Sequence, residues 1–233
     1  MGLKIENKAS NQADMWLYGE VGEGWDDYFT AKGVVDELKK LKGVNAITLH
    51  LNSPGGSVFD GLAIYNTLKN HPARIVTEID GMALSIASII ALAGDEVRMA
   101  GNAMYMIHNP WTMTAGDSRE MRNMADRLDI VRAALLGTYN SKTGDDVTDA
   151  QISDWMDAET WFNAQDAKKY GFIDEITNPI EVAAKFDMSR YNYKNAPKAE
   201  VVEKSTQPMD IALKARVARM SMLINKRRLA AQN

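Results

Sequence analysis

The sequence has 233 residues, of which 45% are hydrophobic, and a formal net charge of −4. This length supports one α/β core with an appendage, and the mild charge argues against a nucleic-acid-binding surface along the whole chain. The absence of cysteine excludes disulfides, thiolate metal sites and a cysteine nucleophile.

The N-terminus and the apolar segments indicate a cytoplasmic protein. Residues 1–16 lack the apolar stretch that a secretory signal requires. The longest apolar run, residues 82–94, is interrupted by two serines and is shorter than the roughly 20 residues of a membrane-spanning helix. We therefore expect no membrane contact and interpret this run as a buried helix.

Strand and helix patterns alternate through the first 176 residues, which predicts an α/β protein with a mainly parallel sheet and right-handed crossovers. The periodicity of apolar residues and the capping signals define the expected elements. In chain order these are a strand at 15–18, a helix at 30–41, a strand at 46–51, a helix at 57–69, a strand at 74–79, a helix at 85–93, strands at 96–99 and 103–108, helices at 117–140, 148–156 and 163–170, and a strand at 172–176.

The composition changes after Pro179. We expect an N-terminal extension at 1–14, a main domain at 15–178, a linker at 179–209 and a basic amphipathic C-terminal helix at 210–233. Residues 211–229 contain six Lys and Arg residues and no acidic residue. Because this tail has the opposite charge to the acidic remainder, it is predicted to bind an acidic surface, such as that of its own oligomer.

Ser85 is the candidate nucleophile. It follows a strand and Gly81 and stands at the start of an apolar helix, where free N–H groups and the helix dipole stabilise negative charge. A serine there also commonly caps the helix, so both interpretations stay open. Ser88, one turn later, is interpreted as a packing residue. The sequence contains no G-x-S-x-G motif, which disfavours an ordinary α/β-hydrolase.

The chain has three histidines, and one of them suits a general base. His50 alternates with leucines on a strand, which is typical of a core or edge position. His71 precedes a proline after a helix and is interpreted as a surface residue. His108 ends an apolar strand just before Asn109 and Pro110, and a side chain at a strand end can reach into a cleft.

A glycine turn, residues 52–56 (Asn-Ser-Pro-Gly-Gly), joins the most strongly alternating strand to a helix. Glycine lets the backbone approach a ligand closely, and N–H groups there could bind an oxyanion. A plain tight turn is the alternative. The turn is not a P-loop, because no Gly-Lys-Ser/Thr follows it. We expect neither a cofactor nor a metal, since no cluster of His and carboxylate residues offers ligands.

Together, four motifs resemble the Clp protease proteolytic subunit family, and in particular the Clp-like peptidases that phages and prophages encode beside capsid genes. They are residues 52–56, 81–85, 106–110 and 164–174. The resemblance covers residues 15–176. It implies a ClpP/crotonase-like spiral of βαβ units, a protruding handle helix at 117–140, and assembly into stacked homo-oligomeric rings.

The resemblance also implies roles for single residues. Ser85 matches the nucleophile and His108 the general base. The backbone N–H groups of Gly56 and Ile86 match those of the oxyanion hole.

The third member of the triad departs from the family pattern. Where the family has an aspartate, five residues before Ala164, this chain has Glu159. A glutamate can hold a histidine tautomer as an aspartate does, given room for one more methylene. Asp157 is the alternative.

The function implied is that of a serine endopeptidase acting on polypeptides, with phage capsid maturation as the specific role and a capsid or scaffold protein as partner. Residues 1–14 do not resemble the family's axial loop, so docking of an AAA+ unfoldase stays open. The alternatives are an inactive ring or scaffold homologue and a crotonase-type acyl-CoA hydratase or isomerase. A Ser–Lys peptidase ranks lower, because residues 70–141 contain no lysine.

Overall fold

The computed structural model describes residues 2–8, 11–24, 27–179, 190–191 and 193–197. The chain divides into two compact units, Met1–Ala196 and Pro197–Asn233. The predicted C-terminal helix at 210–233 and most of the predicted linker lie outside the described residues. Across the described ranges, no helix is both long and apolar enough to cross a bilayer.

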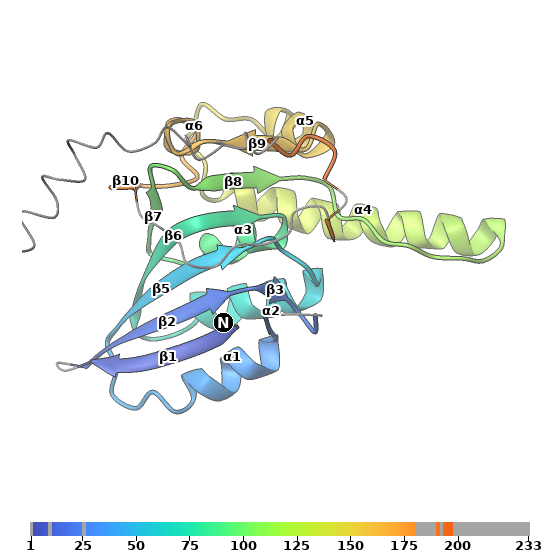
Figure 1. The fold of residues 1–233 in the computed structure, drawn as a ribbon. Coiled ribbons are helices and arrows are strands. Elements are labelled where there is room, and N and C mark those ends of the chain that lie inside the picture. The colour runs from blue at the N-terminus through green and yellow to red at the C-terminus, as the bar shows by residue number, and fades with distance from the viewer. Residues whose placement is uncertain (1, 9–10, 25–26, 180–189, 192, 198–233) are drawn as a thin grey trace, which may run out of the picture. The chain divides into compact units, whose positions relative to one another are not determined.

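The first unit is built from strands and helices (Figure 1). The strands are β1 (Leu3–Lys8), β2 (Gln12–Tyr18), β3 (Glu20–Val21), β4 (Tyr28–Phe29), β5 (Ala46–Ser53), β6 (Arg74–Leu84), β7 (Glu96–Ala100), β8 (Met104–Ile107), β9 (Thr160–Phe162) and β10 (Glu175–Thr177). The helices are α1 (Ala31–Leu38), α2 (Val58–Lys69), α3 (Ile86–Ala91), α4 (Ser118–Asn140), α5 (Asp149–Asp157) and α6 (Ala164–Lys169). The elements from α1 to β10 follow one another in the predicted order apart from the added strand β9, and strands β1, β3 and β4 before them were not predicted.

The main sheet has the order β1-β2-β5-β6-β7-β10, and the pairs from β2 to β10 are all parallel. This confirms the predicted parallel sheet. Strand β6 serves two partners. Its first part, Val76–Ile79, pairs with β7, whereas Met82–Leu84 pair with β8, which in turn pairs antiparallel with β9. The end of β6 is therefore shared between the main sheet and a smaller β8–β9 extension.

The segment before residue 15, which the sequence analysis set apart as an extension, forms strand β1. It pairs antiparallel with β2, from Leu3 opposite Leu17 to Lys8 opposite Gln12. Most of its side chains are exposed, so the hydrophobic pattern is weak and did not predict a strand. The strand forms because β2 offers a free edge whose N–H and C=O groups need partners. Strand β9 was missed for a similar reason, since three residues are too few to show a period.

Helices α2 and α3 pack closely against each other. Gly61 of α2 makes this possible, because a Cβ at this position would lie 2.1 Å from Ile86 Cγ1. All six residues of α3 are buried, which confirms that the apolar run at 82–94 contains a core helix. The contact matters for chemistry because Ile86 directly follows Ser85.

Gly61→Ala is expected to destabilise the fold by about 1–3 kcal/mol, the usual cost of overpacking a core. Gly137→Ala in α4 is the matched control. A Cβ there meets nothing within 4 Å, so the better helix propensity of alanine is expected to stabilise by about 0.5–1 kcal/mol. Denaturant unfolding of both variants measures the difference. Equal stability of the two would contradict the tight α2–α3 packing.

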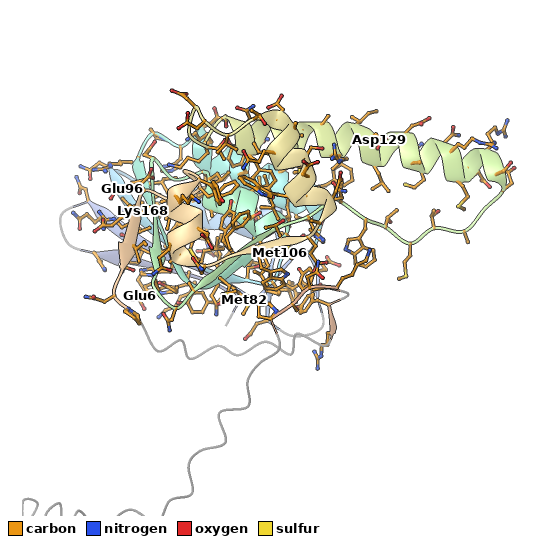
Figure 2. All side chains as sticks on the ribbon, turned by 90° about the horizontal axis from the view of Figure 1, so that it is seen from above. Glu6, Met82, Glu96, Met106, Asp129 and Lys168 are labelled. Carbon is orange, nitrogen blue, oxygen red and sulfur yellow. The ribbon has the colours of Figure 1, made fainter. Side chains whose placement is uncertain are left out.

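Helix α4 extends away from the sheet, and residues 108–117 run out alongside it, as Figures 1 and 2 show. A capping box formed by Asp117 and Glu120 begins the helix. Only Leu135 and Tyr139 of α4 are buried, whereas Ile130 is 71% exposed. The predicted protruding helix at 117–140 is confirmed.

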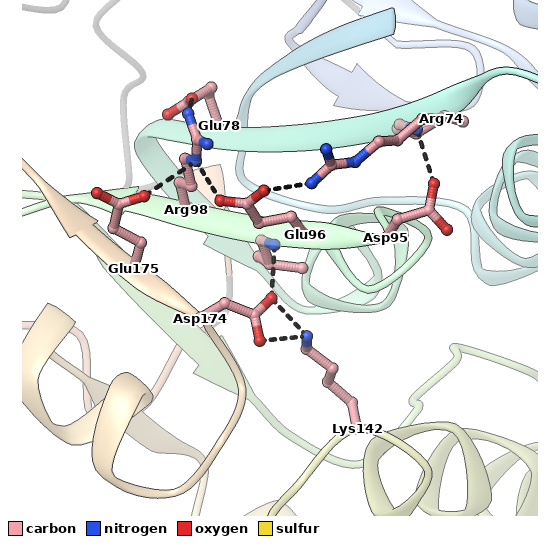
Figure 3. A network of polar contacts seen from close by, with 10 residues as sticks. Arg74, Glu78, Asp95, Glu96, Arg98, Lys142, Asp174 and Glu175 are labelled. Atoms are coloured by element: carbon pink, nitrogen blue, oxygen red, sulfur yellow. Dashed lines mark hydrogen bonds and ion pairs between the residues drawn. The ribbon is translucent and has the colours of Figure 1, made fainter. Parts of the chain in front are cut away.

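A polar network joins the neighbouring strands β6, β7 and β10 of the parallel sheet (Figure 3). Arg98 of β7 forms ion pairs with Glu78 of β6 and Glu175 of β10. Asp174 accepts the Val97 N–H at 2.7 Å. Pairs this exposed contribute about 0–1 kcal/mol each, so the network sets strand alignment more than stability.

Candidate active site

Ser85 stands at the junction of β6 and α3. Its φ of 55° and ψ of −129° lie in a sparsely populated region that costs on the order of 1–3 kcal/mol. Its N–H donates to the Met106 carbonyl of β8 at 3.0 Å. Its side chain makes no capping hydrogen bond, so the cap interpretation does not account for this serine.

His108 directly follows β8, and its imidazole contacts the Ser85 hydroxyl. Leu84 of β6 lies opposite Met106 of β8 in a parallel pair, so the residues that follow leave the sheet at the same end. His108 Nε2 lies 2.7 Å from Ser85 Oγ. This distance allows the imidazole to accept the hydroxyl proton.

The protonation of His108 depends on two opposing influences. Burial lowers the pKa of His108 below its ordinary 6.5, and the negative charge of Glu159 acts in the opposite direction. The net shift is downward. The imidazole is therefore neutral near pH 7, which is the form that can act as a base.

The glycine turn lies directly against the serine. Gly55 has a φ of +95°, and a Cβ there would lie 2.7 Å from Ser85 Cβ. Gly56 has a φ of +143°, and a Cβ there would lie 2.2 Å from the Val21 carbonyl oxygen. Neither position has room for a side chain. The backbone of the turn therefore lies next to Ser85 without side chains in between, and a ligand could approach that backbone closely.

The sequence predicts two backbone N–H groups as oxyanion donors, those of Gly56 and Ile86. In the bridge between Val21 and Gly56, the hydrogen bonds run from Val21 N to Gly55 O and from Ser57 N to Val21 O. In this parallel pattern the N–H of Gly56 faces away from Val21. Ile86 is the first residue of α3, so its N–H has no acceptor within the helix. Neither N–H is used in these backbone hydrogen bonds, as the prediction of two oxyanion donors requires.

Ser88 supports the nucleophile from inside the core. Its hydroxyl donates to the Ser85 carbonyl and lies 2.7 Å from the Tyr139 hydroxyl of α4. The Tyr105 hydroxyl donates to the Ser88 carbonyl at 2.9 Å. Ser88 is fully buried. It packs, as predicted, and also links the Ser85 backbone to the handle helix, a connection that the sequence did not indicate.

Glu159 lies between α5 and β9 and is only 8% exposed. Its carboxylate accepts hydrogen bonds from the backbone N–H groups of Lys194 at 3.0 Å and Asn195 at 2.7 Å. Trp161 Nε1 donates to it at 3.3 Å. Among the described residues, no hydrogen bond joins it to His108, although its charge acts on the pKa of that histidine.

Asp157, the alternative acid, has other partners. Its carboxylate accepts from Asn109 Nδ2 at 2.7 Å and pairs with Arg132 at 3.0 Å. These two hydrogen bonds lower its pKa. The side chain is 57% exposed. The contacts of Asp157 connect the loop after His108 to α4. Because Asp157 is engaged there and Glu159 acts on the pKa of His108, Glu159 is the better candidate for the acid.

The two other histidines have structural contacts. His50 Nδ1 lies 2.9 Å from Asp80 Oδ2, and its ring stacks on Trp16 with centroids 5.1 Å apart. The ring of His71 accepts the Ala73 N–H at 3.2 Å. Within the described residues, His, Asp and Glu side chains form no group of three or more that could hold a metal ion.

Sequence reasoning missed one residue at the site, Tyr193. It lies in the predicted linker at 179–209, yet its ring contacts His108 edge-on with centroids 5.6 Å apart. Its hydroxyl donates to the Pro54 carbonyl of the glycine turn. Two tyrosines in an otherwise polar segment, Tyr191 and Tyr193, were the signal that could have indicated packing.

A serine hydroxyl hydrogen-bonded to a partly buried, neutral imidazole is the arrangement that activates serine as a nucleophile in serine hydrolases. The Clp protease family model matches residues 3–179, so the chain belongs to the Clp protease family. It is a ClpP-like serine peptidase with the ClpP-like α/β fold.

Individual relatives agree with this assignment. The chain is 35% identical to ATP-dependent Clp protease proteolytic subunit 2 of Thermobifida fusca over 168 residues, covering 70% of this chain and 81% of the relative. It is 32% identical to proteolytic subunit 3 of Rhodococcus jostii over 179 residues, covering 75% and 85%. The solved structure of a point mutant of ClpP1 from Listeria monocytogenes has a TM-score of 0.61 at 28% identity, covering 71% of this chain and 91% of that one.

Proposed function

We propose that this chain is an endopeptidase in which Ser85 attacks the peptide carbonyl, His108 acts as general base and Glu159 is the acid of the triad. The observation that carries the proposal is the 2.7 Å hydrogen bond between Ser85 Oγ and His108 Nε2. Family membership supports a peptidase. The geometry supports these residues as its chemical groups.

The first step forms an acyl-enzyme. His108 Nε2 takes the Ser85 proton while Oγ bonds to the substrate carbonyl carbon, and the carbonyl oxygen becomes an oxyanion. The intermediate collapses when the protonated imidazole donates its proton to the amide nitrogen, and the C–N bond breaks. The amine product leaves with the proton that began on Ser85.

The second step releases the acid product. Neutral His108 takes a proton from water, and the resulting hydroxide attacks the ester carbonyl. Collapse of this second intermediate returns the proton to Ser85 Oγ and frees a carboxylic acid. In both steps the N–H groups of Gly56 and Ile86 stabilise the oxyanion, and loss of one such donor in comparable sites costs about 3–4 kcal/mol.

A polypeptide would extend away from Ser85 along the loop after His108. An open pocket of about 230 Å³ lies there, lined by Asn109, Pro110 and side chains of α4. The neighbouring loop carries two exposed apolar side chains, Trp111 (56% exposed) and Met113 (87% exposed). Such exposed apolar residues support contact between subunits along the handle helix. We propose that the peptidase works as a ring homo-oligomer, the assembly that is general in this family, and that it does so in the cytoplasm.

Mass spectrometry of the native particle before and after treatment with a fluorophosphonate tests the proposal. We expect one adduct per subunit, located at Ser85, on a particle with many subunits. An adduct at another serine would refute the assigned nucleophile. A crotonase-type hydratase or isomerase, which needs no activated serine, would stay unlabelled.

A role in phage capsid maturation, with a capsid or scaffold protein as substrate, stays a prediction. Co-expression of the chain with a phage capsid gene tests it directly. A capsid protein shortened in the presence of the wild type and intact beside the Ser85→Ala variant would support the role. A capsid protein that stays full-length in both would remove it.

A further inference from the structure

A short stretch of the predicted linker lies on the catalytic residues. We name Tyr191 and residues 193–195 the Tyr193 segment. The Tyr193 ring contacts the His108 ring at 5.6 Å and the Trp161 ring at 5.7 Å between centroids, edge-on in both cases. Tyr191 stacks on the Tyr193 ring with centroids 5.8 Å apart. The ring of Tyr193 is thus enclosed by aromatic groups beside the general base.

The phenol of Tyr193 contacts the glycine turn close to the nucleophile. Its hydroxyl donates to the carbonyl of Pro54, which directly precedes the two glycines. Burial is the main cause that raises the pKa of Tyr193, and hydrogen bonding to the Ser85 side chain acts in the opposite direction. The phenol therefore stays neutral and occupies space next to Ser85 Oγ.

The backbone of the same segment engages the acid. The N–H of Lys194 donates to Glu159 Oε2 at 3.0 Å, and the N–H of Asn195 donates to Oε1 at 2.7 Å. The Asn195 side chain adds a bond to the Ala158 carbonyl at 2.7 Å. Both carboxylate oxygens are thus directed at the segment. In the described part of the chain, no hydrogen bond links this carboxylate to His108.

The Tyr193 segment therefore lies against His108, Glu159 and the glycine turn, and close to Ser85. Ordinary packing of a linker would bury side chains without selecting these four groups. A peptide substrate needs the same space, because its carbonyl must lie against Ser85 Oγ and its backbone must pass the turn. Substrate and Tyr193 segment therefore exclude each other.

We propose that the Tyr193 segment is an intramolecular inhibitor that occupies the substrate site and diverts Glu159 from His108, and that the site it fills binds a peptide with an aromatic side chain. This proposal rests on the proposed peptidase function. Displacement of the segment opens Ser85 to substrate and lets the Glu159 carboxylate turn to the imidazole. A substrate that carries its own aromatic residue competes for the same aromatic enclosure.

The first experiment measures how fast a fluorophosphonate labels Ser85 in the full-length chain. We expect Tyr193→Ala to label at least tenfold faster than the wild type. Lys194→Pro removes the N–H that holds Glu159 and is expected to accelerate labelling too, whereas Lys194→Ala keeps that N–H and is expected to label at the wild-type rate. Thermal unfolding verifies that each variant is folded.

Equal or slower labelling of both Tyr193→Ala and Lys194→Pro would overturn the inhibitor while leaving Ser85 as a nucleophile. No labelling of any variant would overturn the peptidase proposal and, with it, the inhibitor. The two failures are therefore distinguishable. If Ser85 is labelled as fast in Lys194→Ala as in Lys194→Pro, and faster than in the wild type, the backbone N–H of Lys194 has no specific role.

The second experiment adds a synthetic peptide of residues 190–197 to the Tyr193→Ala variant during hydrolysis of a quenched-fluorescent peptide. We expect competitive inhibition, with KM raised and kcat unchanged. A peptide with alanine in place of the tyrosine at position 193 is the control and is expected to inhibit at least tenfold more weakly. Noncompetitive inhibition, or no inhibition at millimolar peptide, would contradict occupation of the substrate site.

Discussion

Replacement of Ser85 by alanine is expected to reduce peptide hydrolysis by about 10⁴- to 10⁶-fold, since removal of the nucleophile from such a site leaves only binding and oxyanion stabilisation. The loss is expected to be large because Ser85 Oγ is the hydroxyl that lies 2.7 Å from His108 Nε2. Cleavage of a quenched-fluorescent peptide by the purified particle measures the loss. The variant is also expected to take up no fluorophosphonate.

Ser141→Ala provides the matched control. Ser141 is an exposed residue at the end of α4, where its hydroxyl donates to the Thr138 carbonyl at 2.7 Å. We expect its activity to equal that of the wild type. Native mass spectrometry of both variants verifies that the assembly is unchanged. If Ser85→Ala retained full hydrolysis in an intact particle, the chain would be an inactive ring component and the measured activity would belong to a contaminant.

Glu159→Gln is expected to lower kcat/KM by about 10²- to 10⁴-fold, because the amide cannot stabilise the imidazolium that forms on His108. Asp157→Asn is the matched control. Its carboxylate pairs with Arg132 and is mostly exposed, so we expect less than a threefold effect. The reverse order of effects would assign the acid to Asp157.

The pH profile separates an electrostatic role of Glu159 from a merely structural one. Burial holds the pKa of His108 below 6.5 while the charge of Glu159 raises it, so wild-type activity is expected to fall on the acid side with a midpoint below pH 6.5. Glu159→Gln removes the negative charge that raises the pKa of His108. The midpoint of Glu159→Gln is therefore expected at a still lower pH, whereas that of Asp157→Asn is expected to stay in place. An unmoved midpoint in Glu159→Gln would contradict an electrostatic effect of Glu159 on the imidazole.

The proposed inhibitor and the proposed triad share one carboxylate, that of Glu159. Glu159 has a left-handed backbone with a φ of 51°, and its oxygens are bound by the N–H groups of the Tyr193 segment. A glutamate has one more methylene than the aspartate of the family pattern, so its carboxylate can reach either partner by rotation about its side chain. A glutamate in place of the family's aspartate is therefore consistent with two orientations of the carboxylate, one bound to the Tyr193 segment and one directed at His108.

Local sequence determined the order and type of most elements. The strand predicted at 46–51 and the helix predicted at 85–93 correspond to β5 and α3, because their hydrophobic patterns are properties of a few consecutive side chains. The residues around Ser85, His108 and Gly56 also lie in short stretches that can be recognised one at a time. That is why the sequence alone was enough to propose Ser85 as the nucleophile, His108 as the base and residues 52–56 as a ligand-binding turn.

Tertiary structure decided what depends on partners far apart in the chain. Strand β1 exists through its pairing with β2, and Ser85 meets His108 only because the end of β6 pairs with β8. The choice between Asp157 and Glu159 depends on burial and on Arg132, neither of which the spacing reveals. The placement of Tyr193 on the active site is set by contacts 139 residues away, at Pro54. A polar segment carries no period that would predict such a contact, since its energy comes from groups supplied by other elements.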